Sequence, residues 1–338
     1  MKYSKARLAA IGYELAPVVV TSASLEERIA PVYKALGLPM GQLEGLTGIK
    51  ERRWWDPGFE LSEGAARAAR AALEQAGMNV ADLGALIYAS VCRENSEPAT
   101  ACAVADKLGV RPETLVYDIS NACLGVLNGI LDLANRIELG QIRAGMVVAC
   151  ESAREINESM IASMLSRPGD FEHFRLSVAT LTGGSGAVAV IMTDGTLGAG
   201  KHALIGGAAL SEARHHRLCL WNRDSMKTDA SAVLKHGVAL GRSTWQAFER
   251  ETGWNAQTVD KVICHQVGAA HKSAMLGAMG IAVDKDFPAY EFLGNMGTVA
   301  LPVAAALADE RGFLLPGHKT AFLGIGSGLN CIMLGLQW

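Results

Sequence analysis

The chain has 338 residues, a formal net charge of −3 and a composition that is 50% hydrophobic. Its 31 basic and 34 acidic residues are nearly balanced, which gives no sign of a nucleic-acid-binding surface or an acidic tail. The seven cysteines are odd in number and irregularly spaced, which argues against a disulfide framework and favours a reducing, cytoplasmic location. Without a Cys-x-x-Cys pair, no metal site is expected.

No apolar run approaches the roughly 18 residues that a membrane-spanning helix requires. The N-terminal 25 residues superficially resemble a signal peptide, but Glu14 and Pro17 interrupt their apolar stretch. The sequence therefore predicts neither a membrane span nor a signal peptide.

Apolar runs of strand length alternate with helical patterns along the first half of the chain. A helix is expected over 62–77 with Ser62 as its cap, and another from near Cys123 to Gly140. Strands are expected at 83–91, 114–120, 144–152 and 186–192.

The second half repeats this alternation. Strands are expected at 202–210, 261–266, 320–326 and 330–338, and helices at 233–252 and 269–280. Such alternation predicts an α/β fold with mostly buried sheets. Residues 1–195 and 196–338 look like two similar halves, and no low-complexity linker separates them, so they are expected to pack as one body.

Cys123 lies between a predicted strand and a predicted helix in the segment DISNACLG. A helix N-terminus would stabilise a thiolate, lower the pKa of the thiol and offer N–H groups to an oxyanion. Most cysteines, however, are small buried core residues. Position alone leaves both interpretations open.

Three further segments carry candidate chemistry. His265 ends the strand KVICHQ, where open α/β sheets bind ligands, although a solvated loop histidine is equally ordinary. Asn295 lies among glycines in FLGNMGTV, which permits close ligand approach or simply makes a turn. The segment LGIGSGLN at 323–330 predicts a tight turn that donates an N–H to a substrate carbonyl, and LTGGSGAVAV at 181–190 is interpreted as a packing turn.

Together with LTGIKERRW at 46–54, this order of motifs resembles the ketoacyl synthase III branch of the thiolase-fold condensing enzymes, over essentially the whole chain. The resemblance implies a five-layer α-β-α-β-α fold and a homodimer. It also implies that Cys123 is the nucleophile, that His265 and Asn295 are catalytic, and that the N–H groups of Cys123 and Gly328 form an oxyanion hole.

One segment narrows the resemblance. SVCRENSEPATA at 90–101 is similar to the segment that carries a catalytic glutamate in the head-to-head acyl-CoA condensing enzymes of long-chain olefin biosynthesis. Residues 167–187 and 218–229 are similar to other segments of the same enzymes. Glu97 matches that glutamate, which in the subfamily reaches into the partner subunit's active site. A solvated loop carboxylate is the alternative.

The resemblance implies a non-decarboxylative Claisen condensation of two long-chain acyl-CoA molecules to a 2-alkyl-3-oxoacyl-CoA, through an acyl-cysteine. Coenzyme A thioesters would be the substrates, with no metal or redox cofactor, and later enzymes of olefin or ketone biosynthesis would be possible partners. Two alternatives remain: a decarboxylating ketoacyl synthase III that uses malonyl-carrier protein, and an inactive scaffold subunit.

Candidate substrate contacts are less specific. Arg53 and Trp54 could contact coenzyme A, as could Ser327 in the late glycine turn, and Met160 and Met164 could line an acyl channel. The alternatives are a surface cluster of cations and ordinary core residues.

Overall fold

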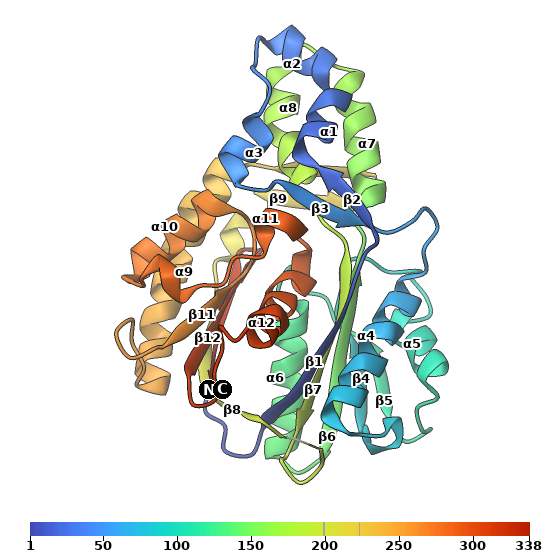
Figure 1. Ribbon diagram of the computed structural model, residues 1–338, viewed down its shortest axis with the longest axis vertical. Helices are drawn as coiled ribbons and strands as arrows, with labels where there is room; N and C mark the ends of the chain where they lie inside the picture. Colours follow the sequence, from blue (N-terminus) through green and yellow to red (C-terminus); the bar gives the residue numbers. More distant parts are fainter. Residues whose placement is uncertain (199, 223) are drawn as a thin grey trace.

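The computed structural model describes residues 1–198, 200–222 and 224–338 (Figure 1). In the first half, the strands are β1 (Arg7–Leu15), β4 (Ala85–Tyr88), β5 (Leu115–Asp118), β6 (Ala144–Glu151) and β7 (Gly186–Thr193). The helices there are α4 (Leu61–Ala76), α5 (Thr100–Leu108) and α6 (Gly125–Glu138). In the second half, the strands are β8 (His202–Ser211), β11 (Lys261–Cys264), β12 (Lys319–Gly326) and β13 (Asn330–Gln337). Its helices are α9 (Ala230–Thr252), α10 (Ala269–Met279), α11 (Tyr290–Leu293) and α12 (Ala300–Glu310).

These nine strands form one sheet in the order β11-β12-β13-β8-β1-β7-β6-β4-β5. Its two parts meet where β8 pairs with β1 through only two residue pairs, Arg7 with Ala203 and Leu8 with His202. Each part contains parallel and antiparallel pairings. In the first part, β4 is parallel to β5 and β6, and β6 is antiparallel to β7. In the second part, β11 is parallel to β12, and β12 is antiparallel to β13. The strands expected from the apolar runs are all present.

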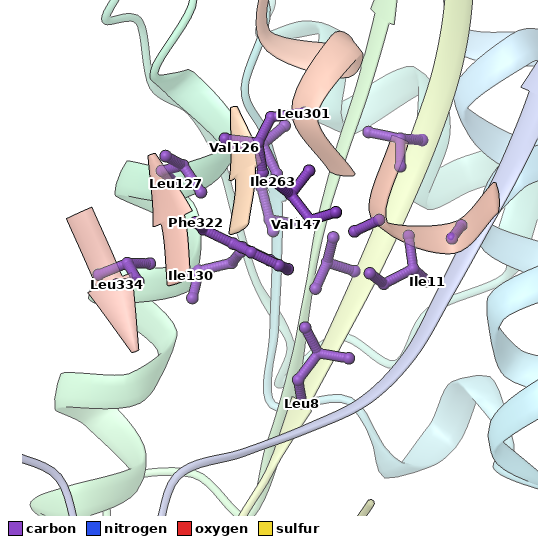
Figure 2. Close-up of a cluster of buried hydrophobic side chains, with 14 of the residues drawn as sticks. Leu8, Ile11, Val126, Leu127, Ile130, Val147, Ile263, Leu301, Phe322 and Leu334 are labelled. Atoms are coloured by element: carbon purple, nitrogen blue, oxygen red, sulfur yellow. The ribbon is translucent and has the colours of Figure 1, made fainter. Parts of the chain in front are cut away.

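Helices separate and flank the two parts of the sheet, giving the predicted α-β-α-β-α layering (Figure 1). Helices α6 and α12 fill the space between the parts, α4 and α5 cover the outside of the first, and α9 and α10 cover the outside of the second. Figure 2 shows the central cluster, in which both parts of the sheet and both middle helices meet through Leu8, Ile11, Val126, Leu127, Ile130, Val147, Ile263, Leu301, Phe322 and Leu334. The two halves therefore share one core.

A further layer lies above the sheet in Figure 1 and forms a cap. It consists of β2 (Val18–Thr21), β3 (Glu51–Trp54), α1 (Ser22–Arg28), α2 (Ala30–Leu36), α3 (Gln42–Thr47), α7 (Arg154–Leu165) and α8 (Phe171–Ser177). The hairpin strands β9 (Cys219–Asn222) and β10 (Ser225–Thr228) pack beneath it. The cap has its own buried apolar cluster. No helix of the described residues is long and apolar enough to cross a membrane.

One predicted detail is wrong: Ser62 does not cap α4. The helix begins at Leu61 after Glu60, and Ser62 lies in its first turn. The backbone N–H of Ser62 instead donates to the Glu94 carboxylate at 2.7 Å. A side chain from a loop distant in sequence thus satisfies one of the free N–H groups of the helix start, a contact that local sequence does not reveal.

Small residues allow α4 to lie unusually close to β1. The buried face of α4 is almost entirely alanine, and a Cβ on Gly12 would lie 2.3 Å from the Ala68 carbonyl oxygen.

We expect Gly12→Ala to lower the free energy of unfolding by about 1–3 kcal/mol, because helix and strand must separate. Denaturant unfolding measures this. Gly45→Ala in α3, where a Cβ meets nothing within 4 Å, is the control and should not destabilise the protein.

Candidate active site

Cys123 lies in a tight turn between β5 and α6. The residue before it, Ala122, has φ 45°, a left-handed backbone conformation that is unfavourable for any residue with a Cβ. Two residues after Cys123, a Cβ on Gly125 would lie 2.7 Å from the carbonyl oxygen of Ala89, which directly follows β4. The turn and the first residue of α6 are therefore pressed against the sheet, and Cys123 comes just before the helix N-terminus, as predicted.

The predicted direction of the Cys123 pKa is wrong in this structure. Burial, followed by the charges of Cys219 and Glu151, raises the pKa of the thiol to about 12. The hydrogen bond from its own backbone N–H lowers the pKa of the thiol but does not outweigh the loss of solvent around the sulfur. Cys123 is therefore a neutral thiol in the free protein and must lose its proton during attack on a substrate.

The late glycine turn lies against Cys123. Gly326, at the end of β12, comes so close that a Cβ there would be 3.3 Å from the Cys123 nitrogen. After the turn, the Asn330 side chain donates to the Asn121 side chain at 2.9 Å. Gly328, the predicted oxyanion donor, lies between these contacts at φ 136°, and Ser327 precedes it. The structure thus places the two predicted oxyanion-hole residues in adjoining turns.

His265 directly follows β11 and is held from both sides. Its N–H donates to the Leu323 carbonyl of β12 at 2.9 Å, so it lies beside the strand that ends at Gly326. The next side chain, Gln266, bonds to the carbonyl of Cys264 and to the N–H groups of Ala289 and Tyr290. Burial and the charge of His271 lower the pKa of His265 to about 3, so its ring is neutral, and its Nδ1 has no partner among the described residues.

Asn295 is clamped by two backbone bonds and one side-chain bond. Its N–H donates to Thr182, its carbonyl accepts from Gly184, and its Oδ1 accepts from the N–H of Gly297 at 3.1 Å. Because Oδ1 is occupied, the Nδ2 hydrogens are the part of the amide left to meet a substrate. The 181–190 segment is thus more than the packing turn predicted, since Thr182 and Gly184 hold the backbone of Asn295.

The turn after Asn295 also contacts the start of α6. The Thr298 hydroxyl accepts a 2.7 Å hydrogen bond from the N–H of Val126, three residues after Cys123. Thr298 and Gly184 were not identified from the sequence, since their partners lie more than a hundred residues away. The turns that carry Cys123, Asn295 and Gly328 are therefore joined directly by hydrogen bonds and close contacts.

Glu97 lies at the tip of a loop whose base is fixed. The Cys92 thiol bonds to the carbonyl and the N–H of Ser152 at 3.4 Å, and Asp118 accepts the N–H groups of Thr100 and Ala101. Glu97 itself is exposed, and no hydrogen bond or ion pair reaches its carboxylate from the described residues. The loop therefore presents Glu97 at the protein surface.

The candidate substrate contacts lie mainly in the cap. Trp54 and Met164 belong to its buried cluster, and Met160 is buried where its sulfur accepts the N–H of Met226. Arg53 is partly exposed and lies 4.0 Å from Glu51. Ser327 is partly buried within the late glycine turn. No cluster of three or more potential metal ligands occurs within residues 1–198, 200–222 and 224–338.

One family model and several full-length proteins match this chain. A family model described as the C-terminal part of 3-oxoacyl-[acyl-carrier-protein] synthase III matches residues 250–338. An acyl-CoA:acyl-CoA alkyltransferase of Shewanella oneidensis is 56% identical and one of Xanthomonas campestris is 35% identical, each over 100% of both chains. A ketoacyl synthase III of Oceanobacillus iheyensis is 27% identical over 86% of this chain and 88% of its own.

Solved structures of the Xanthomonas campestris protein, called OleA, match closely. The cerulenin-bound form gives a TM-score of 0.97 at 35% identity, covering 100% of this chain and 98% of that one. A cysteine-to-serine variant with lauric acid and lauroyl-CoA gives 0.96 at 34% identity, covering 99% and 100%.

Other OleA structures carry substitutions of one glutamate and one histidine. That glutamate, cysteine and histidine have the same separations along their chain as Glu97, Cys123 and His265 have here. Because two acyl-CoA:acyl-CoA alkyltransferases are 56% and 35% identical to it over its whole length, the chain belongs to the acyl-CoA:acyl-CoA alkyltransferase family, in the ketoacyl synthase III-like branch of the thiolase-fold enzymes.

Proposed function

We propose that the protein joins two acyl-CoA molecules by non-decarboxylative Claisen condensation, with one acyl group held on Cys123. The observation that carries the proposal is the convergence of the Cys123, Asn295 and late glycine turns through direct contacts, such as the hydrogen bond from the N–H of Val126 to Thr298. The full-length relatives that are named acyl-CoA:acyl-CoA alkyltransferases support the head-to-head reaction over the decarboxylating alternative.

In the first half-reaction, the Cys123 sulfur attacks the thioester carbonyl of one acyl-CoA. The bond between the carbonyl and coenzyme A breaks, and the thiol proton leaves with coenzyme A, so the thioester is exchanged without any redox change. The N–H groups of Cys123 and Gly328 stabilise the oxyanion, a contact worth about 3–4 kcal/mol for a single donor.

In the second half-reaction, Glu97 removes the α-proton of a second acyl-CoA, whose thioester oxygen lies against His265 and Asn295. The resulting carbanion attacks the acyl group on Cys123, the carbon–sulfur bond breaks, and the Glu97 proton returns to the thiolate. The product is a 2-alkyl-3-oxoacyl-CoA for later steps of olefin or ketone formation. Only protons and an acyl group move, so the steps require neither a metal nor a redox cofactor.

A second protomer completes the proposed site. The sheet ends at β5, an edge strand on which Leu115 is 45% exposed, and a two-fold partner could pair there. The Glu97 loop projects from the same side, since Asp118 at the end of β5 fixes its base. We therefore propose a homodimer in which Glu97 serves the partner's Cys123. The free thiols of all seven cysteines support a cytoplasmic location.

A single long-chain acyl-CoA, supplied without any malonyl donor, should be converted to a branched 3-oxo product with release of coenzyme A. A malonyl donor creates its carbanion by losing CO₂, whereas this substrate needs a base. Mass spectrometry of the product, together with thiol release, measures the outcome. Product only when malonyl-carrier protein is added would establish the decarboxylating reaction instead, and an absence of any acyl adduct on Cys123 would indicate an inactive scaffold.

A further inference from the structure

Glu151 is a buried carboxyl group that the proposed steps do not use. It ends β6, its side chain is 4% exposed, and its Oε2 has no partner among the described residues. Burial raises the pKa of Glu151 to about 7, although hydrogen bonds from the Ser90–Cys92 segment act in the opposite direction. A carboxyl group placed in this way costs stability when ionised, so a role is expected to accompany it.

The Glu151 side chain touches the turn that carries Asn295. Gly297 has φ 56°, and a Cβ there would lie 3.2 Å from Oε1 and 3.3 Å from the carboxyl carbon of Glu151. The N–H of the same glycine fixes the Asn295 Oδ1. Movement of the Glu151 carboxyl group would therefore shift the residue that orients the Asn295 amide.

On its other side, Glu151 touches the base of the Glu97 loop. The N–H of Val91 donates to Oε1 of Glu151 at 3.5 Å. The residues on either side of Glu151 contact the same segment, because the Cys150 carbonyl accepts from the Ser90 hydroxyl and the Ser152 carbonyl accepts from the Cys92 thiol. The indole N–H of Trp55 donates to the backbone carbonyl of Glu151 at 3.0 Å and holds the backbone in place. One carboxyl group thus contacts both segments that serve the second half-reaction.

The charge of Glu151 also reaches the nucleophile. The titratable groups around it are Tyr88 of β4, Cys92 of the loop, Cys150 of β6 and Cys123, and a negative Glu151 raises the pKa of each. None of the four carries a positive charge that would offset it. Ionisation of Glu151 and ionisation of Cys123 therefore oppose each other.

We propose that Glu151 is a positioning residue whose protonated carboxyl group joins the Asn295 turn to the base of the Glu97 loop, and whose ionisation opposes ionisation of Cys123. The positioning part rests on the proposed condensation, in which Asn295 and Glu97 act on the second acyl-CoA. The electrostatic part concerns only the thiol and is independent of what the protein condenses.

The electrostatic part is tested by the rate at which iodoacetamide alkylates Cys123 between pH 6 and pH 10, followed by peptide mass spectrometry so that other cysteines are not counted. Glu151→Gln keeps the shape of the side chain and removes its charge, so its alkylation profile should shift to lower pH than that of the unmodified protein. Glu155→Gln, at an exposed position of α7, is the matched control and should leave the profile in place. Identical profiles for all three proteins would overturn the proposal.

The positioning part is tested by comparing the two half-reactions in folded variants. Glu151→Gln should condense acyl-CoA at close to the normal rate at pH 7, whereas Glu151→Ala should lose most condensation and keep rapid acylation of Cys123. Equal losses in the glutamine and alanine variants would show that the ionised form is required and would overturn the proposal. If no protein condenses acyl-CoA, the proposed function fails, while the alkylation profiles still decide the electrostatic part.

Discussion

Replacing Glu97 with glutamine is expected to reduce condensation of two acyl-CoA molecules by about 10²–10⁴-fold, the range that a positioned general base contributes. The glutamine keeps the shape of the side chain but cannot accept the α-proton. Acylation of Cys123 by the first acyl-CoA should continue, because that step does not use the carboxylate. Single-turnover mass spectrometry of the acyl adduct and steady-state assay of the 3-oxo product separate the two effects. Condensation at the full rate would show that Glu97 is not the base.

Mixed dimers decide whether Glu97 acts within its own protomer. A dimer of one Glu97→Gln protomer and one Cys123→Ala protomer has one site that joins an intact Cys123 to the partner's intact Glu97. Purified mixed dimers should therefore show about half of the activity of the unmodified dimer, because two-fold symmetry gives two equivalent sites. Each homodimeric variant should be inactive. If Glu97 served its own protomer, the mixed dimer would be inactive too.

The sequence predicted most strands and helices of the fold well because these elements follow from local patterns, whereas the five-layer arrangement was implied by the family resemblance. Continuous apolar runs mark strands that are buried on both faces, such as β6 and β7, whose residues are all buried. The helix α4 was likewise expected over 62–77 and forms over Leu61–Ala76. Helix starts were less predictable, as Ser62 shows, because the Glu94 carboxylate that caps α4 comes from a loop 32 residues later.

In the candidate site, too, local features could be predicted from the sequence, whereas features that depend on distant contacts could not. Cys123, His265 and the late glycine turn were candidates because each was expected to follow a strand, where ligands bind in open α/β sheets. Position left their roles open, and the resemblance to the ketoacyl synthase III branch assigned them. The direction of the Cys123 pKa could not be predicted, since it depends on burial and on Glu151, which is distant in sequence but close in the fold. The roles of Gly184 and Thr298 likewise rest on contacts with Asn295 and Val126 that no local pattern encodes.

Replacing Asn295 with alanine should reduce condensation by about 10²–10³-fold, as loss of one fixed oxyanion donor does in other enzymes. The Nδ2 group is the donor at risk, because Gly297 already occupies Oδ1. Asn295→Asp should be at least as deficient, since it keeps the acceptor for Gly297 but replaces the donor with a negative oxygen facing the enolate. Acylation rates of Cys123 should remain within a few-fold of normal in both variants.

The comparison of these two variants separates catalysis from folding. Asn295→Asp retains the bond from Gly297, so the turn that also carries Thr298 and supports the start of α6 should stay intact. Asn295→Ala loses that bond and should unfold at a free energy lower by about 1 kcal/mol, the net value of one hydrogen bond. If acylation and condensation fell together in the aspartate variant, Asn295 would serve the first acyl group as well. Unchanged acylation with lost condensation places its amide at the second acyl-CoA, where the enolate forms.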